Sequence, residues 1–172
     1  LYYSSGILQM ESLYKKEQVK EAVLELLRKN KLQEGYIRPL MYYGYGNMVV
    51  DPKGLPGECS ISCWPWGKDL PHEAVDVKIS SFVRIHPKST VADAKLCGHY
   101  VNSIMASLEI RNTKYHESLF LDYQGNVAEG PGENIFFVKN GGLKTPKLGS
   151  ILNGFTRDTV MAIARSEGIS VE

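Results

Sequence analysis

Hydrophobic residues recur with helical spacing in three segments of this chain. Apolar side chains appear every three or four positions over 17–31, 99–112 and 156–167, with charged or polar residues between them, which predicts three amphipathic helices. In the last of these, Thr156 is the expected N-cap, and Gly168 is the residue expected to end the helix. The buried stripe expected for the helix over 99–112 consists of Val101, Ile104, Met105 and Leu108.

Segments that are aromatic or β-branched and lack this spacing are expected to be strands. They cover residues 36–43, 59–66, 75–83, 117–123 and 134–138. Turn signals follow the last two of them, at 124–126 and at the hairpin sequence 140–142. Helices and strands are grouped rather than regularly alternating, so the pattern predicts an α+β fold.

Composition and charge narrow the classes of function. Lys plus Arg number 20 and Asp plus Glu number 19, and the resulting net charge of +1 argues against a nucleic-acid binder or a polybasic membrane-surface protein. No apolar stretch approaches the ~18 residues of a spanning helix. Three cysteines, an odd and sparse number, fit a reducing cytosol, and the four histidines show no metal-ligand spacing. We therefore expect a cytoplasmic protein without a metal, a nucleic-acid partner or a membrane partner.

The first candidate for chemistry is Lys95, which lies among small and apolar residues just ahead of the helix expected over 99–112. We expect its amine to lose hydration there, which favours the neutral form that acts as a nucleophile or a base. Tyr100 follows near the start of that helix. The alternative is an ordinary surface lysine followed by a tyrosine at a helix start.

Two further segments carry candidate binding groups. Glu129 enters a tight loop of glycine and proline at 130–132, where the backbone can approach a ligand closely and a carboxylate can accept from a protonated ring nitrogen. Gly154 precedes Phe155 and Thr156 at an expected helix start, whose free N–H groups suit a phosphate. Taken singly, these segments are also explained as an ordinary hairpin and an ordinary helix start.

Together, the order and spacing of these segments resemble the signature of class IV pyridoxal-phosphate aminotransferases. The matching positions are Lys95 with Gly98 and Tyr100, Glu129, Asn134-Ile135-Phe136, Leu143-Lys144-Thr145 and Leu152-Asn153-Gly154-Phe155-Thr156-Arg157. Within that class, the runs 35–40 (Gly-Tyr-Ile-Arg-Pro-Leu) and 63–67 (Cys-Trp-Pro-Trp-Gly) resemble branched-chain amino acid aminotransferases. The resemblance extends from residue 1 to residue 172.

The resemblance implies a fold and a reaction. The fold is that of the fold-type IV enzymes, similar to D-amino acid aminotransferase, with mixed or antiparallel sheets and flanking helices. The implied reaction is ping-pong transamination between branched-chain L-amino acids (leucine, isoleucine and valine) and 2-oxoglutarate or glutamate, on a lysine-bound pyridoxal 5′-phosphate. The implied partners are these amino acids and 2-oxo acids, and the implied assembly is a homodimer or a higher homo-oligomer.

Site residues follow from the same resemblance. Lys95 is the expected catalytic residue, both as nucleophile and as the base that moves the substrate proton. The expected cofactor-binding residues are Lys95, Tyr100, Glu129, Asn134, Phe155 and Thr156, and the expected substrate-binding residues are Tyr36, Arg38, Trp66 and Gly132. Alternatively, Arg38 is a structural ion-pair partner and Trp66 is a core residue.

The resemblance also divides the chain into domains. Residues 1–66 match the end of a small N-terminal domain, 67–74 an interdomain loop, and 75–172 the first part of a large cofactor-binding domain. Family members carry further phosphate contacts before and after this region, so we expect the middle of a longer enzyme, incomplete at both ends and inactive alone. The alternatives are a D-amino acid aminotransferase, an aminodeoxychorismate lyase or a cofactor-free fragment of the class. The Tyr-Ile-Arg-Pro run at 36–39 disfavours the lyase.

Overall fold

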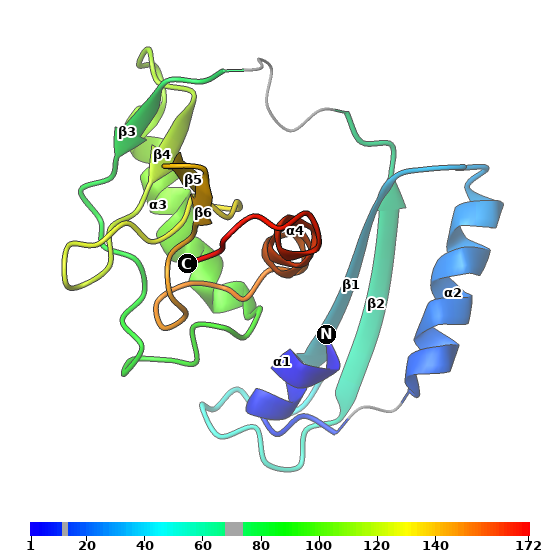
Figure 1. Cartoon of the computed structure of the whole chain (residues 1–172). Helices are drawn as coiled ribbons and strands as arrows, with labels where there is room; N and C mark the ends of the chain where they lie inside the picture. Colours follow the sequence, from blue (N-terminus) through cyan, green and yellow to red (C-terminus); the bar gives the residue numbers. More distant parts are fainter. Residues whose placement is uncertain (12–13, 68–73) are drawn as a thin grey trace. The chain divides into compact units, whose positions relative to one another are not determined.

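The computed structural model describes residues 1–11, 14–67 and 74–172, which fall into two compact units, 1–71 and 72–172 (Figure 1). Both units combine helices with short sheets, of which two are antiparallel and one is parallel, so the expected α+β class is confirmed. The expected interdomain loop lies mostly outside the described residues, and the expected domain boundaries stay a prediction. No helix in the described part of the chain is long and apolar enough to cross a membrane.

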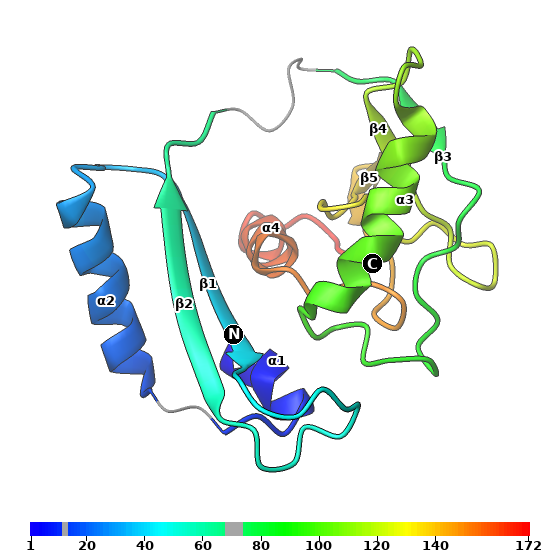
Figure 2. The same ribbon diagram turned by 180° about the vertical axis from the view of Figure 1, so that it is seen from behind.

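The first unit contains α1 (Tyr2–Ile7), α2 (Lys16–Lys29), β1 (Tyr36–Tyr43) and β2 (Gly57–Trp64). β1 and β2 pair antiparallel, with Tyr36 opposite Trp64, and α2 runs beside this two-stranded sheet in both views (Figures 1 and 2). The helix expected over 17–31 and the strand expected over 36–43 are confirmed, and the strand expected over 59–66 starts and ends slightly earlier. The half-buried side chains of α2 are Val19, Val23, Leu26 and Leu27.

The second unit contains β3 (Val77–Ile79), the 3₁₀ turn η1 (Cys97–His99), α3 (Tyr100–Ile110), β4 (Glu117–Leu119), β5 (Phe137–Lys139), β6 (Gly142–Lys144) and α4 (Phe155–Ser166). β3 pairs parallel with β4, and β5 pairs antiparallel with β6. The expected hairpin between β5 and β6 is confirmed, because Asn140 and Gly141 both adopt the positive φ angles of a tight two-residue turn. The strand expected over 134–138 begins only at Phe137.

Two other strands are shorter than the hydrophobic pattern predicts. The strand expected over 75–83 is limited to β3, because Ser81 donates its N–H and its hydroxyl to the Glu109 carboxylate of α3 and leaves the ladder. The strand expected over 117–123 is limited to β4, and the Asp122 carboxylate accepts N–H groups of the turn that follows. Beyond β4, the N–H groups of Phe120 and Asp122 still donate to backbone carbonyls, those of Glu129 and Asn126, so the chain forms a short hairpin there.

α3 buries the face opposite to the one that its hydrophobic pattern predicts. The expected buried stripe is exposed, at 62% for Val101, 56% for Ile104 and 41% each for Met105 and Leu108. Ser103 and Ala106 are buried instead, and the Ser118 hydroxyl of β4 donates to the Ala106 carbonyl over 2.8 Å. Such a close approach of helix and strand leaves room only for small side chains, so size and not hydrophobicity decides which face packs.

α4 begins without a side-chain cap. The N-cap position belongs to Gly154, which has no side chain to accept from the first N–H groups, and the expected N-cap, Thr156, lies inside the first turn. The expectation for Thr156 is therefore wrong. The end of the helix is as expected, since Gly168 follows with a φ of 73° that favours glycine.

The core of the second unit surrounds the fully buried ring of Phe120. Ala106 of α3, Ala128 and Ile151 pack around this ring, and Phe82 lies against the cluster. Segments that are far apart in the sequence therefore meet at one aromatic side chain. Polar residues that adjoin these core residues in the sequence are brought close to one another as a result.

The Glu109 carboxylate ties α3 to the end of β3. It accepts hydrogen bonds from the hydroxyls of Ser80 and Ser81 and lies 3.5 Å from the Lys78 ammonium. These hydrogen bonds lower the pKa of Glu109 from its ordinary value of 4.5 to about 2. A carboxyl with a depressed folded pKa stabilises the protein above its unfolded pKa, and this contribution is lost as the pH falls through that range.

We predict that Glu109→Gln lowers the thermal unfolding temperature at neutral pH, because an amide does not accept these hydrogen bonds as an ionised carboxylate does. The difference from the wild type should shrink as the pH falls from 4.5 to about 2. Thermal unfolding followed by circular dichroism measures it, and Glu167→Gln, an exposed carboxyl at the end of α4, serves as the control. A difference that is independent of pH would contradict the role of the ionised carboxylate.

Candidate active site

The amine of Lys95 contacts the phenol of Tyr100. Lys95 Nζ donates a hydrogen bond to Tyr100 Oη over 2.7 Å and lies 5.3 Å from the centre of the tyrosine ring. Tyr100 is the first residue of α3, so the helix start fixes the phenol that receives the amine. The structure therefore brings together these two expected site residues.

The small residues around Lys95 pack the backbone of its loop and do not bury its amine. Ala92 and Ala94 are 7% and 1% exposed, and the Ala94 N–H donates to the Val91 carbonyl over 3.0 Å. The Lys95 side chain itself is exposed, so the expected loss of hydration is wrong for this structure. The result is an accessible amine on a loop that packing holds in place.

Glu129 is buried beside the core, with only 4% of its surface exposed. Its backbone carbonyl accepts from the Phe120 N–H over 3.0 Å. Arg84 Nε donates to carboxylate Oε1 over 2.7 Å, and the Leu152 N–H donates to Oε2 over 3.1 Å. The carboxylate thus has one charged donor and one neutral backbone donor, from two different segments.

Two opposing effects act on the carboxyl of Glu129. Burial raises its pKa above the ordinary value, because the charged form loses hydration. Arg84, the Leu152 N–H and the Lys95 ammonium favour the charged form and lower the pKa. Burial is the larger effect, so Glu129 holds a proton more readily than an exposed glutamate does. In the described part of the chain, no three His, Cys, Asp or Glu side chains are grouped to hold a metal ion.

Reasoning from the sequence missed Arg84, which is 7% exposed. Its Nη1 donates to Asn102 Oδ1 over 2.9 Å, and Asn102 Nδ2 donates to the Val83 carbonyl over 3.1 Å. The guanidinium also lies 5.3 Å from the centre of the Phe120 ring. The available signal was one basic residue inside the apolar run 82–85, because a buried arginine needs an acidic partner.

Asn134 supports the segment that leads into α4. Its Nδ2 donates to the Leu152 carbonyl over 3.4 Å. Phe155, which is 92% exposed, and Thr156 follow in the exposed first turn of the helix. The structure thus places Phe155 and Thr156, the expected phosphate donors, at an accessible helix start. The role of Asn134 as a cofactor ligand stays a prediction.

Two other residues of the motif also bind backbone atoms. Thr145 Oγ1 donates to the Ile135 carbonyl over 2.9 Å, and the buried Arg157 donates from Nη2 to the Pro146 carbonyl over 3.0 Å. Side chains of the motif therefore hold the path of the chain between 134 and 157.

Gly132 lies in the exposed turn that follows Glu129. Its N–H donates to Glu133 Oε2 over 3.0 Å, and a Cβ at this position would meet no atom within 4 Å. The packing of the chain itself does not require a glycine here. A role of Gly132 toward a substrate is compatible with this open space and stays a prediction.

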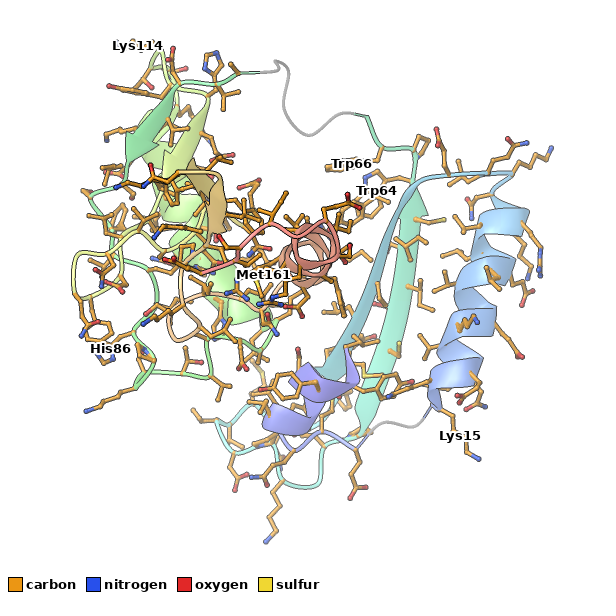
Figure 3. The ribbon with its side chains drawn as sticks, in the orientation of Figure 1. Lys15, Trp64, Trp66, His86, Lys114 and Met161 are labelled. Carbon is orange, nitrogen blue, oxygen red and sulfur yellow. The ribbon has the colours of Figure 1, made fainter. Side chains whose placement is uncertain are left out.

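Tyr36, Trp64 and Trp66 form an aromatic cluster in the first unit. Figure 3 shows the two tryptophans near the end of β2. The ring of Tyr36 stacks on Trp64 at 4.9 Å and lies tilted against Trp66 at 4.8 Å. The Arg38 guanidinium lies 5.2 Å from the centre of the Trp64 ring, a cation–π contact. Trp66 is 51% exposed, which disfavours the alternative that it is a core residue.

Trp64 was not among the expected site residues, although it pairs with Tyr36 across the sheet. A Cβ at Gly35 would lie 2.7 Å from the Trp64 carbonyl oxygen, so the two segments approach closely at the cluster. The signal for Trp64 was its position two residues before Trp66, because such residues share one face of a strand. The substrate residues expected in the first unit lie in or beside this cluster, and their part in one site with Lys95 stays a prediction.

Comparisons with known proteins cover the whole chain. The family model described as amino-transferase class IV matches residues 1–172. The branched-chain-amino-acid aminotransferase of Pseudomonas aeruginosa is 37% identical over 175 residues, which cover 99% of this chain and 57% of that protein. The chain therefore spans little more than half the length of this relative.

Two solved structures have the same fold. The branched-chain aminotransferase from Thermoproteus uzoniensis with norvaline has a TM-score of 0.95 and 40% identity, over 100% of this chain and 59% of that chain. The branched-chain amino acid aminotransferase from Thermobaculum terrenum, in its PLP form, has a TM-score of 0.91 and 32% identity, over 99% and 57%. Because the family model matches residues 1–172 of this chain, the chain belongs to the amino-transferase class IV family.

Proposed function

We propose that this chain is part of a branched-chain amino acid aminotransferase. The enzyme would use pyridoxal 5′-phosphate to move the amino group between leucine, isoleucine or valine and 2-oxoglutarate. The observation that carries the proposal is the contact of the Lys95 amine with Tyr100, in the same unit that buries the Glu129 carboxylate. The named relatives favour the branched-chain activity over the other activities of the class.

The donor groups of the second unit fit pyridoxal phosphate. This cofactor needs an amine for its aldehyde, a carboxylate for its ring nitrogen and N–H donors for its phosphate. Lys95 provides an exposed amine, Glu129 a buried carboxylate, and α4 an uncapped first turn at Phe155 and Thr156. The relative from Thermobaculum terrenum was solved in its PLP form, which supports the same cofactor for this chain.

Lys95 would have two tasks. When bound, pyridoxal phosphate supplies an electron-withdrawing ring that accepts the electron pair released at the substrate Cα. Lys95 Nζ would hold the cofactor at its aldehyde carbon, whose oxygen leaves as water. When the substrate amine takes that place, the freed Lys95 amine would take the proton from the substrate Cα, since an amine is both a nucleophile and a base. Tyr100 Oη already accepts from Nζ and would orient the amine and donate to the phenolic oxygen of the cofactor.

Glu129 and α4 would hold the two ends of the cofactor. Glu129 would keep a proton on the ring nitrogen, which strengthens the electron withdrawal on which the proton transfer depends. The N–H groups of Phe155 and Thr156 would bind the phosphate, because the start of a helix carries partial positive charge. Asn134, expected from the resemblance to bind the cofactor, supports this segment through Leu152.

The substrate site must accept an aliphatic side chain as well as the carboxylate of glutamate. Tyr36 and Trp66 offer aromatic faces for the aliphatic side chains. Arg38 offers an exposed guanidinium that suits the carboxylate. Gly132 leaves open space above its turn.

The proposal includes an assembly and a location. The family resemblance supports a homodimer or a higher homo-oligomer. The three cysteines, at 59, 63 and 97, are free thiols, which suits a reducing compartment such as the cytoplasm.

We predict that Lys95→Ala in the complete protein reduces transamination by at least about a hundredfold, because the nucleophile and base are lost. The yellow absorbance of the lysine-bound cofactor should also disappear. In the wild type, borohydride should bleach this absorbance and leave the cofactor attached to the peptide that contains Lys95, as mass spectrometry would show. Lys88→Ala, an exposed lysine of the same unit, is the control. Near-native turnover of Lys95→Ala would refute the assignment.

We predict that Glu129→Gln lowers kcat by about 10²–10³ while pyridoxal phosphate still binds, because a neutral amide does not keep the ring nitrogen protonated. Steady-state kinetics and a cofactor titration by absorbance separate the two effects. The exposed Glu167→Gln should change neither. Unchanged turnover in Glu129→Gln would mean that the ring nitrogen has another partner.

A further inference from the structure

Leu152 is held at both of its backbone polar groups. Its N–H donates to the Glu129 carboxylate, at 3.1 Å to Oε2 and 3.3 Å to Oε1. Its carbonyl accepts from Asn134 Nδ2 over 3.4 Å. The preceding residue, Ile151, is 2% exposed and belongs to the core. The backbone donor of Glu129 is therefore placed by the amide of Asn134 together with the core.

Gly154 is required by Asn134 and not by its own backbone conformation. Its φ of −74° and ψ of 142° are open to any residue. A Cβ at this position would lie 2.3 Å from Asn134 Oδ1, which is closer than real contacts allow, and 3.2 Å from Asn134 Cγ, which is a tight contact. The Asn134 amide therefore occupies the space that a side chain at 154 would fill.

Asn134 is itself held in place through its neighbour. The carbonyl of Ile135 accepts from Thr145 Oγ1 over 2.9 Å. On the other side of Gly154, the guanidinium of Arg157 is buried and donates to the Pro146 carbonyl. The contact between the asparagine amide and the glycine is thus supported from both chain segments that form it.

We propose that Asn134, through its contact with Gly154, is a positioning residue for Glu129. The contact keeps the Leu152 N–H on the carboxylate, where it is the neutral donor beside the charged donor from Arg84. When the contact is lost, the segment relaxes and the carboxylate keeps only its charged donor. The consequence for the cofactor rests on the proposed function, whereas the contact itself does not.

The ionisation of Glu129 reports on the position of the Leu152 N–H. Carbon-13 NMR of labelled glutamate carboxyls, with the resonance assigned by Glu129→Gln, follows this ionisation in the complete protein without cofactor. Arg84 and Lys95 are the charged groups that act on the carboxyl, and the variants retain both. We expect Asn134→Ala to raise the pKa of Glu129 by about half a unit to one unit, because the charged form loses one hydrogen bond.

A second substitution tests the contact from its other side. Gly154→Ala should raise the same pKa, because the new methyl group displaces the Asn134 amide. In the Asn134→Ala background, Gly154→Ala should add little, because the amide that it would strike is absent. Two controls should leave the titration unchanged: Asn30→Ala removes an exposed amide that donates to the Leu26 carbonyl, and Gly6→Ala adds a methyl group with no atom within 4 Å.

The cofactor provides another readout. If Glu129 contacts pyridoxal phosphate as proposed, Asn134→Ala should raise the dissociation constant of the cofactor by about two- to tenfold, which corresponds to one lost hydrogen bond. Absorbance titration of the complete protein measures it. An unchanged constant would show that the position of the Leu152 N–H does not reach the cofactor.

The outcomes separate positioning from simple stability. A lower unfolding temperature with an unchanged Glu129 titration would show that Asn134 only supports the fold, and would overturn the proposal. A full effect of Gly154→Ala in the Asn134→Ala background would also overturn it. If Asn134→Ala does not fold, Gly154→Ala alone tests the contact. A wild type that binds no pyridoxal phosphate would refute the proposed function and leave this titration unaffected.

Discussion

A buried carboxylate is tolerated only when other groups replace its lost hydration, and the second unit of this chain contains such an arrangement at its core. Glu129 is 4% exposed and Arg84 is 7% exposed, and their charged atoms lie 2.7 Å apart. Arg84 is fixed in turn by Asn102 and lies over the ring of Phe120. The group proposed to hold the cofactor ring is therefore also part of the packing that holds the unit together.

Contacts of this kind also connect positions of the class IV motif that are far apart in the sequence. Glu129 accepts the N–H of Leu152, and Asn134 donates to the carbonyl of the same residue. Thr145 and Arg157 donate to backbone carbonyls of the connecting segments. Several motif side chains thus bind the backbone of another segment of the motif. Their order in the motif does not require that each one touches a ligand.

Local interactions made part of this structure predictable from the sequence. α2 and the β5–β6 hairpin follow from patterns within a few residues, and the contact of Lys95 with Tyr100 spans little more than a helical turn. Long-range packing was not visible. The hydrophobic pattern pointed to the wrong face of α3, because the close approach of β4 selects small residues. Arg84 was missed because its partner, Glu129, is 45 positions away and only the fold brings them together.

The energetic coupling between Arg84 and Glu129 tests this account most directly. It is measured by denaturant unfolding of the complete protein at neutral pH, as wild type, Arg84→Met, Glu129→Gln and the double variant. Each single change should cost about 3–5 kcal/mol, because it leaves a buried polar or charged partner uncompensated, and the double change should cost clearly less than the sum. Strictly additive costs would contradict the claim that this buried pair organises the unit.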